Sequence, residues 1–378
     1  MNVQGFAWWL TLTSGLPNPL PTNAAQREWE ITKTPLVVIE SDAPGRAPLG
    51  RIVGARRLPT GQILVADASA VELRLFDARG RFVRVVTRRG RGPGELTNIV
   101  SLARTSRALV AIGGQDFVSV GLDASAPTRY AIPSTGGPPS GSVRGVFGTA
   151  QLLIGESRFR ILSPPSQVTR DTTRLVITSL ADPTQRRDLG RFPNQTSLVL
   201  VIPAAPGGLK FGRLETAPQL EIAVTDNLCW IGDSGASELL RVDVKSDTSQ
   251  RVRIPFAPRR WSGDTLSQYV RTRANNAASP VEEIFTSAWG DREYRPEQMP
   301  AFRTLHGDVR DGVWIEHFLP SLAARPRFTV LSSSGRVVAT VTAPRAMRLL
   351  DIGEDYIIAA EQDENDVERI TLYPLGRR

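Results

Sequence analysis

The phrase VADASAVELRLFD at residues 65–77 returns as IGDSGASELLRVD at residues 231–243, a separation of 166 residues. Aligned without a gap, the two copies share Asp67/Asp233, Ala70/Ala236, Glu72/Glu238, Leu73/Leu239 and Asp77/Asp243. This separation is too long for one supersecondary unit, but it suits three units of about 55 residues, near the top of the range for repeat architectures. The chain is therefore predicted to consist of repeated units.

Further echoes define what one unit contains. LRLFDARGRFVRVVT at 73–87 aligns with FTVLSSSGRVVATVT at 328–342, and VERITLYPLGR at 367–377 resembles VELRLFDARGR at 71–81. The first pair shares Gly80/Gly335, Arg81/Arg336, Val83/Val338 and Thr87/Thr342. Each copy is an alternating segment, a turn with Gly and a second alternating segment, which is the pattern of a β-hairpin.

Six such units follow one another, at about 50–95, 98–133, 143–192, 208–256, 300–343 and 346–374. The last unit holds only about three strands, whereas the strand-like segment EWEITKTPLVVIE at 28–40 precedes the first unit. Pairing this segment with the last unit would close a ring, as propellers do to protect their strand edges. We predict an all-β fold, a single six-bladed β-propeller over residues 28–378. A β-sandwich array would explain neither the leading strand nor the incomplete last unit.

One segment, about 262–296, departs from the strand pattern. Ser279 and Glu282 form a capping box with Pro280 at the first helical position. The residues that follow place an apolar stripe at helical spacing, formed by Val281, Ile284, Phe285 and Ala288. A helical insertion between the fourth and fifth units is predicted, with its apolar face over one mouth of the ring.

Composition limits the classes of partner. The net charge is +8, but 43 of the 46 basic residues are Arg, and they are scattered along the 378-residue chain. Nucleic-acid binding requires basic residues clustered on one face, so a nucleic-acid partner is disfavoured. The single cysteine, Cys229, excludes an internal disulfide, and its strand-like surroundings predict a buried thiol.

The N-terminal segment has the features of an export signal. FAWWLTLTSGL at 6–16 is apolar and too short to span a bilayer, and a Pro-rich stretch and Asn23-Ala24-Ala25-Gln26 follow it. This resembles the apolar region and cleavage zone of a secretory signal, although no Lys or Arg precedes it. Residues 1–27 are predicted to be a signal-like or disordered segment, and the protein to be periplasmic or extracellular, with a cytoplasmic location as the alternative. No other segment approaches a transmembrane helix.

Several motifs are similar to a known family. LPTGQILVAD at 58–67 followed by LFDARGRFV at 75–83 resembles the NHL-type repeat of six-bladed β-propellers. RGRGPGEL at 89–96 resembles the G-x-G-x-GPGE-F run of one largely uncharacterised bacterial group, with Leu96 in place of the Phe. The segments 311–315, 355–358 and 367–369 also fit that group. The resemblance covers about residues 28–375 and implies the propeller fold; since many members carry secretion signals, it also favours export.

Two acids are the candidate channel ligands. Asp67 and Asp233 occupy the same repeat position, so they would stand across the ring axis from each other. The resemblance implies that a cation can sit in such a channel, because related propeller enzymes hold one with Asp, Asn and Glu. The two acids are therefore either turn residues that accept backbone N–H groups or ligands of a channel Ca²⁺. No cofactor is predicted, and the metal site is left open.

Aromatic residues around the insertion are the other candidates. Trp261, Trp289 and Tyr294 flank or end it, where they either contact a ligand or pack the insertion. The two histidines, His306 and His317, lie in no metal-binding pattern, and no catalytic residue is predicted. The glycine-rich run at 89–96 lacks the GK[ST] ending of a phosphate-binding loop.

These observations predict a monomeric, non-catalytic propeller that binds a protein, peptide or glycan at the face that carries the insertion, because loops on a rigid scaffold carry function. The alternative is a lyase or lactone hydrolase that uses a channel cation as a Lewis acid. A third possibility is a binder of anionic polymers, whose affinity would fall steeply with salt.

Overall fold

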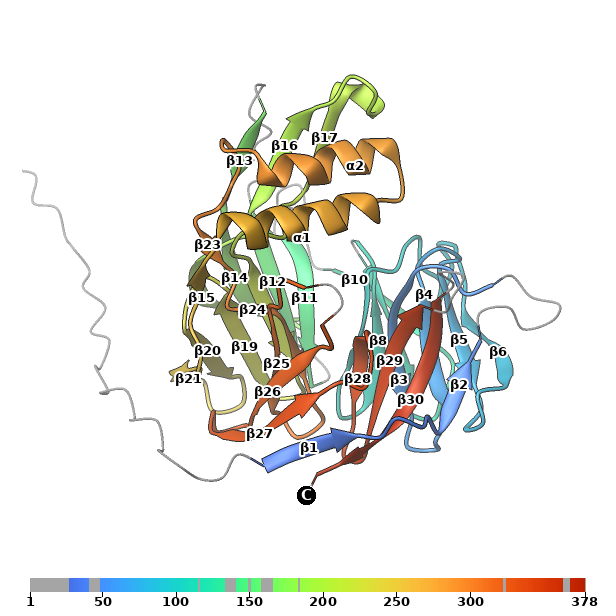
Figure 1. Cartoon of the computed structure of the whole chain (residues 1–378). Coiled ribbons are helices and arrows are strands. Elements are labelled where there is room, and N and C mark those ends of the chain that lie inside the picture. The colour runs from blue at the N-terminus through green and yellow to red at the C-terminus, as the bar shows by residue number, and fades with distance from the viewer. Residues whose placement is uncertain are drawn as a thin grey trace, which may run out of the picture.

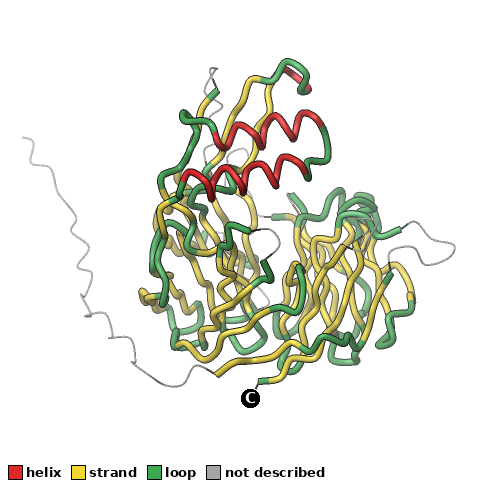
Figure 2. The backbone as a smooth tube through the Cα atoms, viewed as in Figure 1, coloured by secondary structure: helices red, strands yellow, loops and turns green. Residues whose placement is uncertain are grey.

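The fold is a β-propeller in which antiparallel sheets surround a central axis, as the computed structural model shows (Figures 1 and 2). The structure describes residues 27–40, 48–114, 116–132, 141–148, 151–157, 166–182, 184–321, 324–362 and 368–377. Residues 1–26 of the signal-like segment and the FRILS stretch at 159–163 lie outside these ranges. None of the described helices has the length and apolar character that crossing a bilayer requires.

Each of the first four predicted units forms a four-stranded sheet. Their strands are β3 (Ile52–Arg57), β4 (Ile63–Asp67), β5 (Glu72–Phe76) and β6 (Phe82–Thr87); β7 (Ser101–Arg104), β8 (Ala108–Ile112), β9 (Asp116–Gly121) and β10 (Thr128–Ala131); β11 (Gly141–Phe147), β12 (Gln151–Ser157), β14 (Thr172–Ser179) and β15 (Arg186–Pro193); and β18 (Leu220–Val224), β19 (Leu228–Asp233), β20 (Glu238–Asp243) and β21 (Thr248–Arg253). Consecutive strands pair within each sheet, as the hairpin signals predicted.

The N-terminal strands join the last two sheets. These contain β24 (Phe302–Gly307), β25 (Val313–His317), β26 (Arg327–Leu331) and β27 (Val337–Thr342), then β28 (Arg348–Ile352), β29 (Tyr356–Gln362) and β30 (Glu368–Gly376). Strand β2 (Val37–Ile39) pairs with β30 and completes the last sheet. Strand β1 (Arg27–Ile31) pairs in parallel with β27 and antiparallel with β30, and Figure 1 shows it running between them. The prediction that an N-terminal strand closes the last sheet is confirmed.

The first strands of these sheets surround the axis. Each contacts the next in the order β3, β7, β11, β18, β24, β28 and back to β3. The core lies between neighbouring sheets: Trp230 packs with Phe302 between the fourth and fifth sheets, and Trp314 packs with Trp29 and Tyr373 between the fifth and sixth. Both faces of most sheets are therefore buried.

The repeated glycines Gly80 and Gly335 have a structural cause. Both adopt the left-handed conformation, with φ of +81° and +83°, in the turn before the outer strand of their sheet. A Cβ on Gly80 would lie 2.9 Å from Val37 Cγ1 in β2, and one on Gly335 would lie 2.8 Å from Val252 Cγ2 in β21. Each turn therefore packs against the outer strand of the preceding sheet, and glycine is required for both conformation and space.

The predicted helical insertion is confirmed as α1 (Gly263–Asn275) and α2 (Pro280–Ser287), followed by a 3₁₀ turn η2 (Ala288–Gly290). The Ser262 and Ser279 side chains accept hydrogen bonds from Thr265 N and Glu282 N and so cap the two helices. A short ladder of β22 (Arg259–Arg260) and β23 (Gln298–Met299) ties the two ends of the insertion together.

The apolar face of the insertion does not cover the mouth of the ring as predicted. It packs against a further sheet of β13 (Gln167–Thr169), β16 (Ser197–Val201) and β17 (Leu209–Arg213), with the 3₁₀ turn η1 (Pro206–Gly208) between the last two strands. Leu198 and Leu200 of β16 pack with Leu266 and Phe285 of the helices. Strand β13 comes from the connection between β12 and β14, and β16 and β17 come from the connection between β15 and β18. Together they offer the apolar surface that the helices bury. Figure 1 shows α1 and α2 beside β16 and β17, above one side of the propeller.

Candidate functional site

Asp67 stabilises a turn through its carboxylate. It is fully buried at the end of β4, where Oδ1 accepts hydrogen bonds from Ser69 N (2.9 Å) and Ala70 N (3.2 Å). Its Oδ2 accepts from Gly50 N (3.1 Å) and lies 3.5 Å from Arg74 Nη2. These partners hold the β4–β5 turn and occupy both oxygens of the carboxylate.

Asp233 occupies the matching turn at the end of β19. Its Oδ1 accepts from Gly235 N (2.9 Å) and from Arg170 Nη2 (2.7 Å). The two acids therefore each serve their own turn and do not meet in the channel, so they do not fit a shared Ca²⁺. Within the described ranges, no group of three His, Cys, Asp or Glu side chains could hold a metal ion.

Trp261, Trp289 and Tyr294 are buried in the cluster between the insertion and the β13–β16–β17 sheet. Trp261 also donates from Nε1 to Thr216 O at 3.0 Å. The structure thus places all three in the core of the insertion and not on a ligand-facing surface. Their apolar area holds the helices on the added sheet.

The predicted burial of Cys229 is also observed, and burial raises the pKa of its thiol.

His317 is a half-buried histidine that is neutral near pH 7. Burial first, and then the charges of Arg327 and Arg259, lower its pKa from 6.5 to about 4. Its Nε2 lies 2.8 Å from Thr329 Oγ1, and its ring packs on Phe256 at 4.5 Å between centroids.

We expect His317 to make the folded state sensitive to acid. Because the unfolded chain binds this proton near pH 6.5 and the folded chain only near pH 4, its contribution is complete above pH 6.5 and is lost as the pH falls toward 4. Urea unfolding at pH 7.5, 5.5 and 4.5 should show that the free energy of unfolding falls less with falling pH in His317→Gln than in the wild type. Gln is chosen because it keeps an acceptor for Thr329. Equal declines would contradict this assignment.

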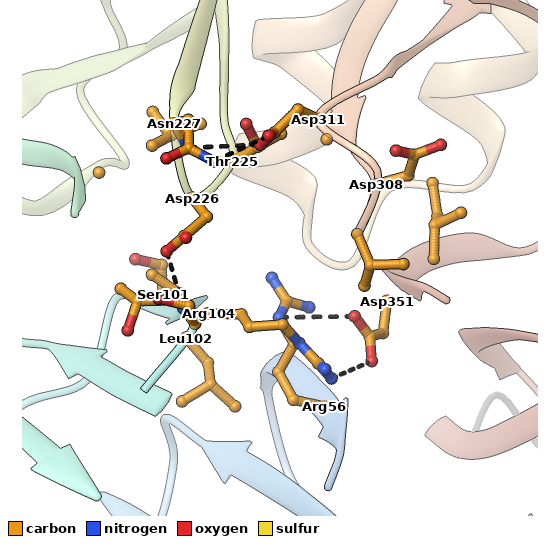
Figure 3. A pocket seen from close by; sticks show the side chains of 18 of the residues that line it. Arg56, Ser101, Leu102, Arg104, Thr225, Asp226, Asn227, Asp308, Asp311 and Asp351 are labelled. Atoms are coloured by element: carbon orange, nitrogen blue, oxygen red, sulfur yellow. Dashed lines mark hydrogen bonds and ion pairs between the residues drawn. The ribbon is translucent and has the colours of Figure 1, made fainter. Parts of the chain in front are cut away.

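The channel holds the main candidate site. At the end formed by the β7–β8, β18–β19 and β24–β25 loops, hereafter the loop end, a cavity of about 480 Å³ opens (Figure 3). Three arginines from consecutive inner strands line it: Arg56 of β3, Arg104 of β7 and Arg144 of β11. Asp226 and Asp311, from the loops after β18 and β24, line the other half.

Asp351 of β28 holds two of these arginines in place. Its Oδ2 accepts from Arg104 Nη2 (2.8 Å), Arg57 N (3.0 Å) and Tyr356 Oη (3.0 Å), while Oδ1 lies 3.8 Å from Arg56 Nε. Figure 3 shows both guanidinium groups beside this carboxylate. Burial lowers the pKa of Arg56, an effect that Asp351 opposes and Arg104 reinforces. One carboxylate therefore balances two partly desolvated cations.

Arg144 has no such partner. It is exposed to solvent and makes no hydrogen bond or ion pair with any residue that the structure describes; partial desolvation by its surroundings still lowers its pKa, with only the charge of Glu221 opposing. A β-bulge explains its direction: Val143 pairs with Ile154 and Gly145 with Leu153, so Arg144 is the extra residue between them. Its guanidinium is thus a free, fork-shaped donor in the channel wall.

The acidic half of the cavity is also fixed by its loops. Asp226 Oδ1 accepts from Ser106 N (2.7 Å), and Asp311 Oδ2 accepts from Asn227 Nδ2 (2.9 Å). Asp311 has φ of +60°, a conformation that non-glycine residues rarely adopt and that recurs at ligand sites. The cavity therefore presents positive charge on one side and negative charge on the other.

A second cavity of about 450 Å³ lies at the end of the channel next to the insertion. It is lined by Arg303, the extra residue of a bulge in β24, and by His306 and Glu316, whose Nε2 and Oε2 are 3.4 Å apart. Nearby Glu221 has its pKa raised by burial, although Arg213 Nη2 lies 2.6 Å from its Oε1. These side chains largely pair with one another, unlike Arg144.

Sequence reasoning did not select the channel arginines. The available signal was an Arg inside the otherwise apolar first strand of a unit, as in SVRGVF at 142–147. Because the first strands surround the axis, a charged residue there lies at the channel. Whether it faces the channel depends on the bulge, which the strand pattern does not reveal.

No family model matches the sequence, and no curated protein matches it. Among solved structures, a member of the DUF4221 family from Bacteroides vulgatus superposes with a TM-score of 0.50 at 9% identity, covering 93% of this chain and 100% of that chain. A Bacteroides fragilis protein named as exported has a TM-score of 0.49 at 12% identity, covering 94% and 98%. Virginiamycin B lyase from Staphylococcus aureus has a TM-score of 0.41 at 10% identity, covering 92% and 99%. At these identities the likeness concerns the fold alone.

Proposed function

We propose that this protein is an exported, non-catalytic propeller of six NHL-like blades that binds a peptide segment at the loop end of its channel. The bound segment carries an acidic and a basic side chain close together. The observation that carries the proposal is the unpaired guanidinium of Arg144, which lines the same cavity of about 480 Å³ as Arg56 and Arg104.

The arginine side of the cavity suits a carboxylate. Guanidinium groups bind carboxylates through two parallel hydrogen bonds, and these bonds are strongest where water is partly excluded. Arg56 and Arg104 share Asp351, while Arg144 adds a charge with no carboxylate in hydrogen-bonding contact among the described residues. A carboxylate from a ligand would complete this half of the site.

The aspartate side suits a cation. Asp226 and Asp311 are only half-buried, and each keeps acceptor capacity after its contact with Ser106 or Asn227. A ligand with both charges would satisfy the two halves together, and a peptide with adjacent acidic and basic residues meets this condition. The closed order of six inner strands and the Gly80/Gly335 turns support six equivalent blades, and the apolar segment at 6–16 supports export.

Two alternatives stay as predictions. The lyase or lactone-hydrolase alternative depended on channel acids that hold a cation, and Asp67 and Asp233 do not provide that site, so no metal-dependent step is included here. Binding of an anionic polymer would need arginines gathered on one surface; many arginines here pair with acids of their own sheet or a neighbouring one, such as Arg74 with Glu72 and Arg251 with Glu238.

The proposal predicts charge-matched peptide binding. Calorimetric titration with acetyl-Gly-Glu-Lys-Gly-amide should show saturable binding, and replacing Glu or Lys by Gln in the peptide should weaken it. Arg144→Gln should reduce the affinity about fivefold, the upper range for an exposed ion pair. Arg79→Gln, in the exposed β5–β6 turn, is the matched control and should bind as the wild type does. Equal affinity for the Glu and Gln peptides, or no effect of Arg144→Gln, would refute the proposal.

A further inference from the structure

A third cavity, separate from the two in the channel, lies where β1 crosses the fifth sheet. It has a volume of about 500 Å³ and lies between the start of β1, the β26–β27 hairpin and the β24–β25 loop. Its wall is largely apolar, formed by Trp29, Val330, Leu331, Val337 and Val338. This size and lining are typical of a pocket for a small ligand or a single large side chain.

Three arginines also line this cavity: Arg27, Arg310 and Arg377. Arg310 pairs with Glu354, with Nη2 and Oε2 2.6 Å apart. Arg27 is exposed and forms no ion pair with any residue in the described ranges. The cavity therefore has more positive charge than its own acids balance.

The buried acid of the cavity, Asp308, already accepts hydrogen bonds on both carboxylate oxygens. Its Oδ1 accepts from Arg310 N and Gly312 N, both at 2.9 Å, and its Oδ2 accepts from Trp314 Nε1 at 3.3 Å. Arg377 Nη2 reaches this carboxylate only at 3.7 Å. Asp308 thus mainly shapes the loop and only weakly neutralises Arg377.

Arg377 is the residue that would meet a ligand's charge. Its side chain is 10% exposed, its guanidinium stacks on the Trp29 ring at 4.6 Å, and its Nη2 donates to Gly353 O at 2.6 Å. Its Nε is buried without an acceptor among the described residues, and burial lowers its pKa while Asp308 opposes the shift. Because Asp308 compensates the Arg377 charge only weakly, a carboxylate beside this guanidinium would be stabilising.

We propose that this cavity binds a carboxylate attached to an apolar group, with the apolar group against Trp29 and Val338 and the carboxylate toward Arg377 and Arg27. A small apolar acid and the C-terminal residue of a peptide share this chemistry. The site is independent of the proposed channel function: the arginines Arg56, Arg104 and Arg144 do not line it, and the two cavities share only Asp308.

Saturation-transfer NMR and calorimetric titration with N-acetyl-L-phenylalanine test this proposal, with N-acetyl-L-phenylalanine amide as the probe that lacks the carboxylate. The acid should bind saturably and at least about tenfold more tightly than the amide, as expected for a charge-assisted hydrogen bond. Acetyl-Gly-Gly-Phe distinguishes the two sources: tighter binding than the single amino acid supports a peptide C-terminus, and weaker binding supports a small acid.

Matched variants locate the binding. Val338→Trp should fill the cavity and abolish binding, whereas Val83→Trp, at the same repeat position on the exposed outer strand of the first sheet, should not. Arg27→Gln should weaken binding of the acid by about fivefold, the upper range for an exposed ion pair, and leave the amide unchanged. Arg144→Gln should have no effect, so failure of the channel proposal leaves this one standing. Equal binding of acid and amide, or normal binding by Val338→Trp, would overturn the inference.

Discussion

A chain that lacks residues 27–40 is expected to lose the closed propeller. These residues form β1 and β2, which complete the last sheet and join it to the fifth. They bury Trp29, Ile31 and Ile39, and each such side chain contributes about 1.5–3 kcal/mol when buried. The free energy of unfolding of a domain is only about 5–15 kcal/mol, so losing the burial of these three side chains removes a large part of it.

The same deletion would expose two strand edges. The edges of β27 and β30 would lose their partners, and unpaired edges promote association between chains. Circular-dichroism melting and size-exclusion chromatography should show early unfolding and aggregation. A chain that begins at Arg27 is the control and should retain the transition of the full chain. Ile39→Ala, with an expected loss of about 2–5 kcal/mol, tests the same closure in a full-length protein. Identical melting of all these chains would contradict the assigned closure.

Asp67→Ala is expected to destabilise the protein far more than Asp233→Ala, although the two acids share one repeat position. Asp67 is fully buried and accepts hydrogen bonds from Gly50, Ser69 and Ala70. Hydrogen bonds to a charged group contribute about 1.5–3 kcal/mol each, so we expect a loss of about 3 kcal/mol or more. Asp233 is partly exposed and accepts from one backbone N–H, Gly235 N, while water can replace much of its contact with Arg170; its loss should therefore be about 1–2 kcal/mol.

Urea unfolding of the two variants measures this difference, since the midpoint shifts with stability at constant slope. Asp67→Asn keeps one acceptor oxygen and should fall between Asp67→Ala and the wild type. Ca²⁺ should not change the midpoint of the wild type, because each acid is already bonded to the backbone N–H groups of its own turn. A Ca²⁺-dependent rise that Asp67→Ala removes would restore the channel-ligand interpretation of this acid.

The fold could be predicted from the sequence because the same hairpin, with the same turn requirements, recurs along the chain. Gly80 and Gly335 match in sequence since both must adopt a positive φ against the outer strand of the preceding sheet. Ser279 and Pro280 predicted the start of α2 because capping is local. The β13–β16–β17 sheet was missed, because β13 interrupts the third unit, β16 and β17 follow that unit, and none of the three strands matches a segment of another unit. Without that sheet, the apolar face of the insertion was assigned to the wrong surface.

The sequence by itself determined the repeated hairpins, the closure by an N-terminal strand and the capped helices, since these depend on alternation, turn chemistry and capping over a few residues. Only the tertiary structure decided which charged groups meet. The same repeat position made Asp67 and Asp233 look like partners across the axis, yet each is held by the N–H groups of its own turn. Arg144 became the free cation of the channel because a bulge in β11 turns it out of register and three inner strands bring arginines to one wall. Register shifts and contacts between distant sheets depend on the packing of the whole ring, and a local pattern does not encode them.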